Sequence, residues 1–242
     1  MTYSKKEQSA AATHDSHLQN IKEVYGNKLA ALDGDIGQVK DFYFDDKIWV
    51  IRYLVADTGS WLTGRLVLLS PHVLGKLDRD DNTLQVKLRR MQIQDSPSIE
   101  SHMPVSRQYE IEYYRYYGWP PYWDGGAMWG LGGYPVVLPP SIEEMDDHRL
   151  YHHRDDKHLQ STQALTGYHI QSVDETIGHV SGFLVNDKSW AIRDLVVETG
   201  HWYSGKEILI SHSKVERISY EESKVFVNLT KADIQRTADK DL

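Results

Sequence analysis

The sequence predicts a mainly β protein with two tandem small antiparallel β-barrels that arose by internal duplication. The first observation is a repeat, because "DKIWVIRYLVADTGSW" at residues 46–61 returns as "DKSWAIRDLVVETGHW" at residues 187–202. The second is that apolar and polar residues alternate near the end of both copies, which is the period of a half-buried strand. The third is an aromatic segment with Gly and Pro between the copies, which we interpret as the linker.

The repeat extends well beyond its best-matched stretch. A shift of 141 positions aligns residues 13–93 with residues 154–234 without a gap. Between residues 36–70 and 177–211, 17 of 35 positions are identical, so we expect a duplicated unit of about 85 residues. The predicted domains are a tail at 1–12, a first repeat at 13–99, an acidic aromatic linker at 100–153 and a second repeat at 154–240.

Each repeat contains several strand and hairpin signals. The clearest is an alternating strand near its end, in which the apolar residues are Leu84, Val86 and Leu88 and, in the second copy, Val225, Val227 and Leu229. The segments "RDDN" and "YEES" before it are typical turns, which predicts a hairpin with the preceding strand.

A second hairpin is expected earlier in each repeat. In the first copy it turns at Asp45-Asp46 and returns through Trp49, and in the second it turns at Asn186-Asp187 and returns through Trp190. A further turn at "TG" then leads into "GRLVLLS" or "GKEILIS". About six short strands fit in each unit, and a small antiparallel sheet often curls into a barrel to hide its edges.

These elements, taken in order, resemble the PRC-barrel family. The resemblance lies in the Ile-Gly-x-Val opening, the acidic turn before Trp, the Trp-x-Ile-Arg-x-Leu-Val run, the Thr-Gly-x-Trp turn and the Leu-Leu-Ser or Leu-Ile-Ser strand. The cytoplasmic domain of the photosynthetic reaction-centre H subunit and the C-terminal domain of the ribosome maturation factor belong to this family. The resemblance covers both repeats.

Two such domains around an aromatic linker look like the bacterial tandem PRC-barrel proteins, which are sometimes linked to the stress response. The family implies a binding or assembly module and does not imply catalysis. From the sequence we expect this chain to differ from the reaction-centre protein by lacking its N-terminal membrane helix, and from the ribosome factor by lacking its separate N-terminal domain.

Composition narrows the classes of partner. The 242 residues include no Cys, and no apolar run of about 18 residues occurs, so we expect a cytoplasmic protein without stable membrane insertion. The net charge of -8 argues against a nucleic-acid partner. The linker region at 100–153 carries 8 acids and 3 bases, which also disfavours an anionic membrane surface.

Several repeated residues are candidates for either core or function. We expect Trp49 and Trp190 to lie in the barrel cores, because both copies keep large apolar residues at the same spacing. Arg52 and Arg193 interrupt apolar strands, which indicates a structural ion pair or an interface charge. Their natural partners by position are the acids five residues further on, Asp57 and Glu198.

Two further groups of residues recur at the same positions in both repeats and are interpreted differently. Trp61 and Trp202 each follow a turn, where an aromatic side chain is often partly exposed, so both are candidate interface residues. The repeated glycines form no phosphate-binding motif and are interpreted as turn residues. They are Gly37, Gly59 and Gly64, with Gly178, Gly200 and Gly205 in the second copy.

The linker holds 10 of the chain's 26 aromatic residues between Tyr109 and Tyr134, which a simple spacer would not need. Its tyrosine spacing predicts a short helix that Gly118 and the prolines after it end. Three interpretations remain open: a cover for apolar barrel surface, a partner-binding or self-association strip, and a membrane-interface belt. The candidate interface residues here are Tyr113, Tyr117, Trp119, Trp123 and Trp129.

No motif indicates an enzyme, a cofactor or a metal centre. The sequence has no Gly-x-Ser-x-Gly elbow and no His-Glu-x-x-His pattern. Nitrogen and carboxylate ligands suitable for zinc or nickel crowd two segments, but in no established spacing. These ligand types are at His14, Asp15 and His17, and at His152, His153, Asp155, Asp156 and His158.

We therefore expect a non-catalytic protein that acts as a protein–protein adaptor or a self-associating scaffold, with a homo-oligomer favoured. The alternative is a small-molecule or metal-ion sensor that binds its ligand between the barrels and the Trp-rich linker.

Overall fold

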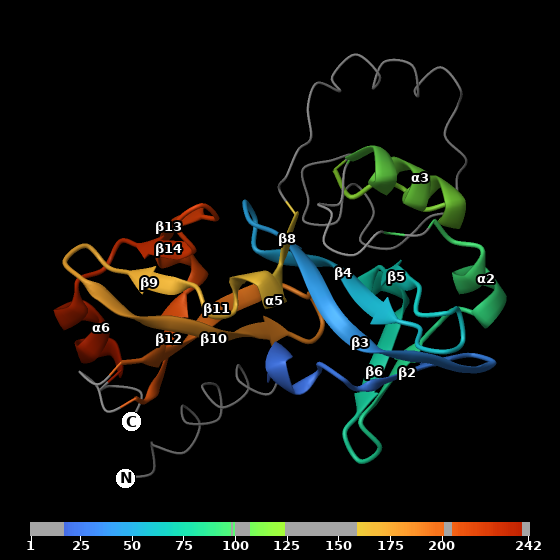
Figure 1. Cartoon of the computed structure of the whole chain (residues 1–242), viewed down its shortest axis with the longest axis horizontal. Helices are drawn as coiled ribbons and strands as arrows, with labels where there is room; N and C mark the ends of the chain where they lie inside the picture. The colour runs from blue at the N-terminus through green and yellow to red at the C-terminus, as the bar shows by residue number, and fades with distance from the viewer. Residues whose placement is uncertain (1–16, 98, 100–106, 124–158, 201–204, 239–242) are drawn as a thin grey trace, which may run out of the picture. The chain divides into compact units, whose positions relative to one another are not determined.

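The computed structural model describes residues 17–97, 99, 107–123, 159–200 and 205–238 (Figure 1). The fold is mainly β, with two seven-stranded sheets. The chain divides into two compact units, and unit 1 contains segments from both ends of the sequence. Unit 1 comprises described residues within Met1–Tyr25, Trp49–Ile51 and Ser161–Leu242, and unit 2 those within Gly26–Ile48 and Arg52–Gln160.

The sheet of the first repeat runs in the order β5-β4-β3-β2-β7-β6, and β8 pairs with β3. Its strands are β2 (Lys28–Ala31), β3 (Gly34–Asp45), β4 (Val50–Asp57), β5 (Leu66–Leu69), β6 (Leu74–Asp78), β7 (Thr83–Val86) and β8 (Leu159–Ser161).

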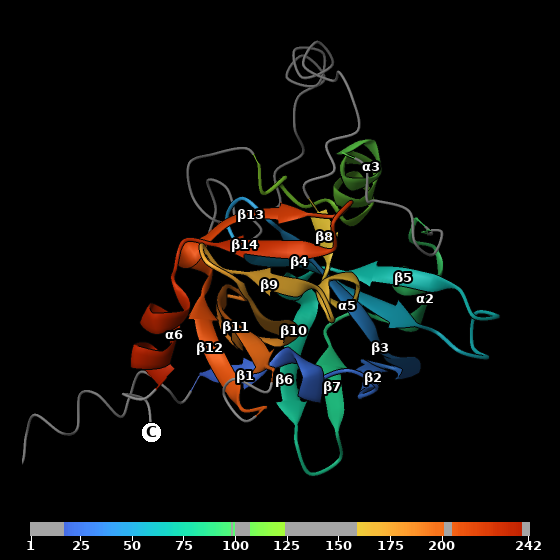
Figure 2. The same cartoon turned by 60° about the vertical axis from the view of Figure 1, so that its left-hand side comes forward.

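The sheet of the second repeat runs in the order β12-β11-β10-β9-β14-β13, and β1 pairs with β10. Figure 2 shows β14 between β9 and β13 in this sheet. Its strands are β1 (Leu18–Asn20), β9 (His169–Gln171), β10 (Thr176–Asn186), β11 (Ile192–Thr199), β12 (Glu207–Ser211), β13 (Val215–Ser219) and β14 (Lys224–Val227).

Short helices connect or follow these strands. The α-helices are α2 (Arg90–Gln94), α3 (Arg107–Tyr117), α5 (Thr162–Leu165) and α6 (Lys231–Ala238). The 3-10 helices are η1 (Ile21–Glu23), η2 (Pro71–Val73) and η5 (His212–Lys214).

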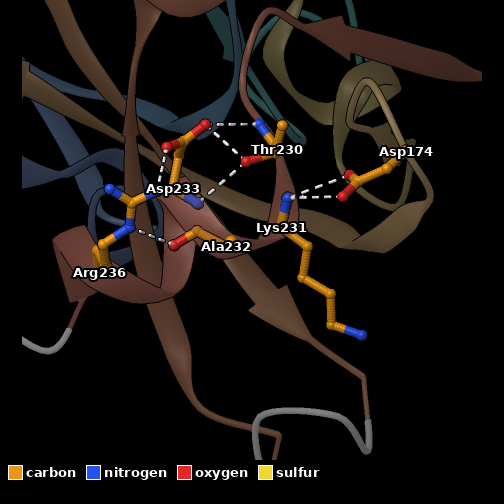
Figure 3. Close-up of polar contacts among 6 residues, drawn as sticks. All are labelled: Asp174, Thr230, Lys231, Ala232, Asp233 and Arg236. Carbon is orange, nitrogen blue, oxygen red and sulfur yellow. Dashed lines mark hydrogen bonds and ion pairs between the residues drawn. The ribbon is translucent and has the colours of Figure 1, made fainter.

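The last helix of each repeat begins against an aspartate from an earlier turn. The Asp174 carboxylate accepts a hydrogen bond of 3.1 Å from the Lys231 backbone N–H at the start of α6 (Figure 3). Asp33 accepts one of 2.7 Å from the Arg90 N–H at the start of α2. Such acceptors satisfy N–H groups that a helix leaves without an intrahelical partner. A hydrogen bond from the Ser172 hydroxyl, and to a lesser degree the one from the Lys231 N–H, lowers the pKa of Asp174.

The predicted hairpins are confirmed in both repeats. Strands β6 and β7 pair antiparallel, as do β13 and β14, across the turns expected from "RDDN" and "YEES". The second predicted hairpin is the antiparallel pair β10–β11 and its counterpart β3–β4. Local turn chemistry and alternating apolar residues were therefore sufficient to place these strands.

Three features of the predicted sheets were wrong. The pairs β2–β7 and β9–β14 are parallel, so the sheets are mixed rather than wholly antiparallel. Each sheet has seven strands instead of about six. Among the described strands, no pairing joins β5 to β6 or β12 to β13, so the sheets are not closed into barrels by hydrogen bonds.

The additional strand of each sheet comes from the other repeat. The shift of 141 residues that aligns the repeats places β1 on β8. However, β1 pairs with β10 of the second repeat, with Gln19 opposite Val185, and β8 pairs with β3 of the first repeat. The two repeats have thus exchanged their entry strands.

Trp49 and Trp190 are buried, as expected, with 7% and 8% of their surface exposed. Both adopt the left-handed backbone conformation, with φ values of 57° and 58°. This conformation is uncommon for a large non-glycine residue, and it occurs here at the same position of both repeats. The repeated Trp therefore occupies a specific backbone position as well as the core.

Two of the predicted turn glycines lie inside strands. Gly37 is in β3 with φ of 120°, and Gly178 is in β10. A β-carbon at Gly37 would overlap the carbonyl oxygen of Asp57, and one at Gly178 would overlap that of Glu198. These glycines permit close approach of two strands, a requirement that the sequence pattern alone did not distinguish from a turn.

Candidate functional site

An aromatic segment, residues 107–123, lies on one face of the unit 2 sheet, and we call it the aromatic strap. It begins with α3, which ends at Tyr117. Gly118 follows with φ of 66°, a left-handed conformation that suits a helix C-terminus, and Pro120 and Pro121 cannot continue the helix. The helix predicted from the tyrosine spacing is thus confirmed.

The strap packs on apolar side chains that three strands present on one face. Val55 of β4 lies opposite Leu68 of β5, and Tyr43 and Tyr53 extend the same surface. Figure 1 shows α3 alongside β4 and β5. The strap buries three of its tyrosines almost completely here, with exposures of 0%, 2% and 4% for Tyr113, Tyr114 and Tyr122.

A carboxylate lies within this apolar contact. Glu110 is fully buried, and its Oε1 accepts hydrogen bonds of 2.9 Å from the Tyr53 hydroxyl and 2.7 Å from the Tyr122 hydroxyl. The Tyr113 hydroxyl accepts a hydrogen bond of 2.9 Å from the Ser70 backbone N–H. Burying a carboxylate without hydrogen-bond donors is unfavourable, so the Tyr53 and Tyr122 hydroxyls are what stabilise Glu110 in this position.

Arg52 joins the same cluster. Its side chain is 2% exposed, and the guanidinium carbon lies 3.7 Å from the ring centroid of Tyr122, a cation–π contact. Burial lowers the pKa of Arg52, although nearby tyrosines and Asp45 oppose this effect. Arg52 thus contacts the strap directly from β4.

The expected ion pairs within each repeat were wrong. Both acids contact other residues instead of the arginines. Asp57 accepts a hydrogen bond of 2.9 Å from the Gly59 N–H, and Glu198 Oε2 lies 3.5 Å from His179 Nε2. Arg193, which is about half exposed, lies 3.7 Å from Asp194. Residues five apart in a strand point to opposite faces and are separated by about 16 Å, so the proposed pairing was not compatible with a strand.

The outer edge of the strap is only partly buried. The rings of Tyr117 and Trp119 stack with centroids 4.6 Å apart and planes at 13°. Tyr116 is 40% exposed, and its hydroxyl donates a hydrogen bond of 2.8 Å to the Gln92 carbonyl oxygen. We call these three side chains the aromatic ridge.

Burial favours the neutral form of the tyrosines in and beneath the strap. It raises the pKa of Tyr53 and Tyr113 well above the usual value, and the Glu110 charge adds to this effect at Tyr53. It raises the pKa of Tyr117 to about 12. The Tyr53 hydroxyl, which donates to Glu110, therefore keeps its proton at neutral pH.

The structure brings together five of the nine predicted interface residues in and beneath the strap. They are Arg52, Tyr113, Tyr117, Trp119 and Trp123. Trp61 lies elsewhere in unit 2, with the Arg90 guanidinium carbon 4.6 Å from its ring centroid, and Arg193 is in unit 1. Trp129 and Trp202 lie outside the described residues.

Sequence reasoning missed the residues that anchor the strap. Glu110, Tyr53, Tyr114 and Tyr122 are all buried in the cluster. A signal for Glu110 was present, because it is an acid within an aromatic run, but its hydrogen-bond partners lie up to 57 residues away. Only the folded chain brings them together.

A second feature is an open hollow of about 440 Å³ in unit 1. His169, His179 and Glu198 line it, together with Ile177, two threonines and three glycines. In the described part of the chain, no three His, Asp or Glu side chains converge as metal ligands in their present positions. No helix in the same residues is long and apolar enough to span a membrane.

Comparison with known proteins identifies one domain. A PRC-barrel domain is found at residues 164–234, which extend from within α5 to within α6. The family model gives no support for a second such domain in the first repeat. No curated protein matches the chain.

Proposed function

Because residues 164–234 form a PRC-barrel domain, we propose that the chain is a non-catalytic binding or assembly protein built from two such domains by internal duplication. The second part of this proposal is supported by 17 identities in 35 aligned positions and by the same strand order in the two sheets. We further propose a cytoplasmic location, on the absence of Cys and of a long apolar run in the sequence, and a link to stress, on the resemblance to the tandem proteins.

The observation that carries the proposal is the aromatic ridge on a well-anchored support. Buried contacts at Glu110, Tyr113 and Arg52 hold the strap on the sheet, so the ridge is ordered before any partner arrives. Tyr and Trp lose little conformational entropy on binding and are enriched among the residues that dominate interface energies. We propose that the ridge contacts a protein partner, and that a second copy of this chain is the first partner to test.

Deletion of the whole strap would not test this function. Tyr113, Tyr114 and Tyr122 are part of the unit 2 core, so their removal would expose apolar sheet surface. A point substitution at the ridge is more selective. Trp119→Ala removes the half-buried stacking partner of Tyr117 and leaves the buried tyrosines in place.

The test is light scattering in line with size exclusion over a range of concentrations. We expect the intact chain to associate and Trp119→Ala to weaken the association by more than tenfold, since interface hot spots contribute about 2 kcal/mol or more. Val173→Ala is the matched control, because Val173 is a 68% exposed apolar residue in unit 1.

Two results would contradict the proposal. The first is that the intact chain stays monomeric at every concentration, and that every partner it binds is also bound by the Trp119→Ala variant. The second is a Trp119→Ala variant with a lower melting temperature but unchanged association, which would mean that the ridge only covers the sheet.

The alternative function, a small-molecule or metal-ion sensor, is favoured by a different observation. The hollow in unit 1 places two imidazoles and a carboxylate on its wall, and these are side chains that bind ions and polar ligands. A ligand that binds the folded state of this unit in preference to the unfolded state would raise its melting temperature.

A further inference from the structure

Four ionisable side chains form a row across the second-repeat sheet. His169 of β9 lies opposite His179 of β10, which lies opposite Glu198 of β11, and Glu198 lies opposite Glu207 of β12. Directly opposed residues of neighbouring strands point to the same face. The neighbouring position on β9, Ile170, is fully buried on the other face, so the row lies on the face away from the core.

The middle pair of this row is already close. His179 Nε2 lies 3.5 Å from Glu198 Oε2, and the two side chains are 43% and 51% exposed. Glu207 is engaged differently, because its Oε1 accepts a hydrogen bond of 3.1 Å from the Ser181 hydroxyl. His169, His179 and Glu198 also line the hollow, whereas Glu207 does not.

We propose that His169, His179 and Glu198 bind a divalent transition-metal ion such as Zn²⁺ or Ni²⁺. Two imidazole nitrogens and one carboxylate oxygen are ligands that these ions accept, and water would complete the coordination. This inference specifies the ligand and the site of the sensor alternative and rests on that alternative. It is separate from the assembly function proposed for the aromatic ridge.

The spacing of the middle pair fits this assignment. Zinc binds nitrogen and carboxylate oxygen at about 2.1 Å, and two ligands of a tetrahedral site are then about 3.4 Å apart. The observed 3.5 Å between His179 Nε2 and Glu198 Oε2 is close to this value. An ion could therefore bind both atoms with little movement of either side chain.

The third ligand must move. No three side chains converge in the present arrangement, so His169 would rotate its imidazole toward the ion. Its β-carbon starts about 5 Å from that of His179, the usual distance for opposed residues. His169 is exposed, so it can change between staggered rotamers without displacing core residues.

The first repeat provides an internal comparison. The corresponding positions carry Lys28, Gln38 and Asp57, of which Lys28 and Gln38 are also directly opposed. The same type of sheet therefore forms without imidazoles in this row. Histidines at both positions of the second repeat are not needed to build the fold, which supports a role in binding.

Calorimetric titration of the intact chain with ZnCl₂ in a non-coordinating buffer tests the proposal. We expect the row to bind one Zn²⁺ ion per chain. The affinity for zinc should fall at least tenfold in His179→Gln, and it should also fall in His169→Gln and in Glu198→Gln. His152→Gln/His153→Gln is the control, because it removes two imidazoles of the histidine-rich segment at residues 152–158, which lies outside the row. The control should bind as the intact chain does.

A second measurement locates the ion. Ni²⁺ is paramagnetic and should broaden the amide NMR signals around His169, His179 and Glu198 more strongly than those of β1, which pairs with residues 184–186 at the other end of β10. An unchanged melting temperature of the ion-free variants would show that the substitutions leave the fold intact.

The proposal is overturned if the intact chain binds no zinc, or if His179→Gln binds it as the intact chain does. Loss of binding in the His152→Gln/His153→Gln variant alone would also overturn it, while leaving a sensor function at that segment open. Binding at the row without any effect of zinc on partner association would support the site and contradict the sensor function.

Discussion

At the residue scale, the most consequential group is the buried carboxylate of Glu110. It accepts hydrogen bonds from one tyrosine of the sheet and one of the strap, so it connects the two through charge-assisted contacts. An apolar side chain at this position could also be buried, but it would not require the Tyr53 and Tyr122 hydroxyls to be in place. We infer that Glu110 specifies how the strap lies on the sheet.

Tyr53→Phe should destabilise unit 2 by about 1–3 kcal/mol, because it removes one donor to a buried carboxylate and leaves the ring in place. Denaturant unfolding followed by Trp fluorescence measures this change. Tyr43→Phe is the control in the same cluster and should change the free energy of unfolding by less than about 0.5 kcal/mol. Equal effects of the two substitutions would show that the Tyr53–Glu110 hydrogen bond does not stabilise the fold.

The same tyrosines should make unit 2 sensitive to alkali. Below the ordinary tyrosine pKa of about 10, folded and unfolded chains both hold the phenolic protons, so the stability is fully present. As the pH rises further, the unfolded chain releases these protons while burial raises the pKa of Tyr53 and Tyr113 in the folded chain and the pKa of Tyr117 to about 12. Stability is therefore lost from about pH 10 upward.

Absorbance of tyrosinate near 295 nm and far-UV circular dichroism, recorded together, check this expectation. The buried tyrosines should ionise in the same pH range in which the strands unfold. If all the tyrosines titrate near pH 10 while the circular dichroism stays unchanged, the strap tyrosines are accessible to water.

At the scale of single elements, the entry strands are informative because each completes the sheet of the other repeat. Strand β1 covers the end of β10 that β9 does not reach, with Leu18 opposite Asn186 and Asn20 opposite Leu184. The Asn20 side chain lies close to Gly182, where a β-carbon would meet it. The exchange is therefore built into the packing of β10.

Gln19→Pro and Gln160→Pro provide matched tests of this exchange. Proline removes a backbone donor and is poorly accommodated in a paired strand. Gln19→Pro should speed amide hydrogen exchange in β10 and leave β3 protected, whereas Gln160→Pro should do the reverse. If each substitution instead affects the sheet of its own repeat, the entry strands are not exchanged.

At the scale of the whole molecule, the two compact units do not coincide with two contiguous halves of the chain. Unit 1 requires β1 and residues 49–51 in addition to the second repeat, where Val50 forms an antiparallel bridge with Ala191. The sheet of the first repeat requires β8, which begins at Leu159. Neither half contains every strand of its own sheet.

Fragments 1–123 and 154–242 should therefore be much less stable alone than the intact chain, and a mixture of the two should recover structure. Circular dichroism and light scattering of the separate and mixed fragments measure this. A fragment that folds alone as a monomer, with the melting temperature of the intact chain, would contradict the requirement for an exchanged strand.

The amino-acid sequence was sufficient for features that depend on neighbouring residues. Turn residues, alternating apolar positions and the repeat of 141 residues located the hairpins, and tyrosine spacing with Gly118 located α3. Each of these signals acts over a few positions, where backbone preference and side-chain periodicity are strong.

Long-range pairing was decided only in the folded chain. The sequence does not show which sheet β1 or β8 joins, or which buried hydroxyls donate to Glu110. These contacts join residues that are distant in the sequence, in the case of β1 by more than a hundred positions, and that share no local pattern. The two entry strands are alike in sequence, so either could pair with either sheet by local preference. Packing and hydrogen-bond satisfaction across the whole molecule select the exchanged arrangement.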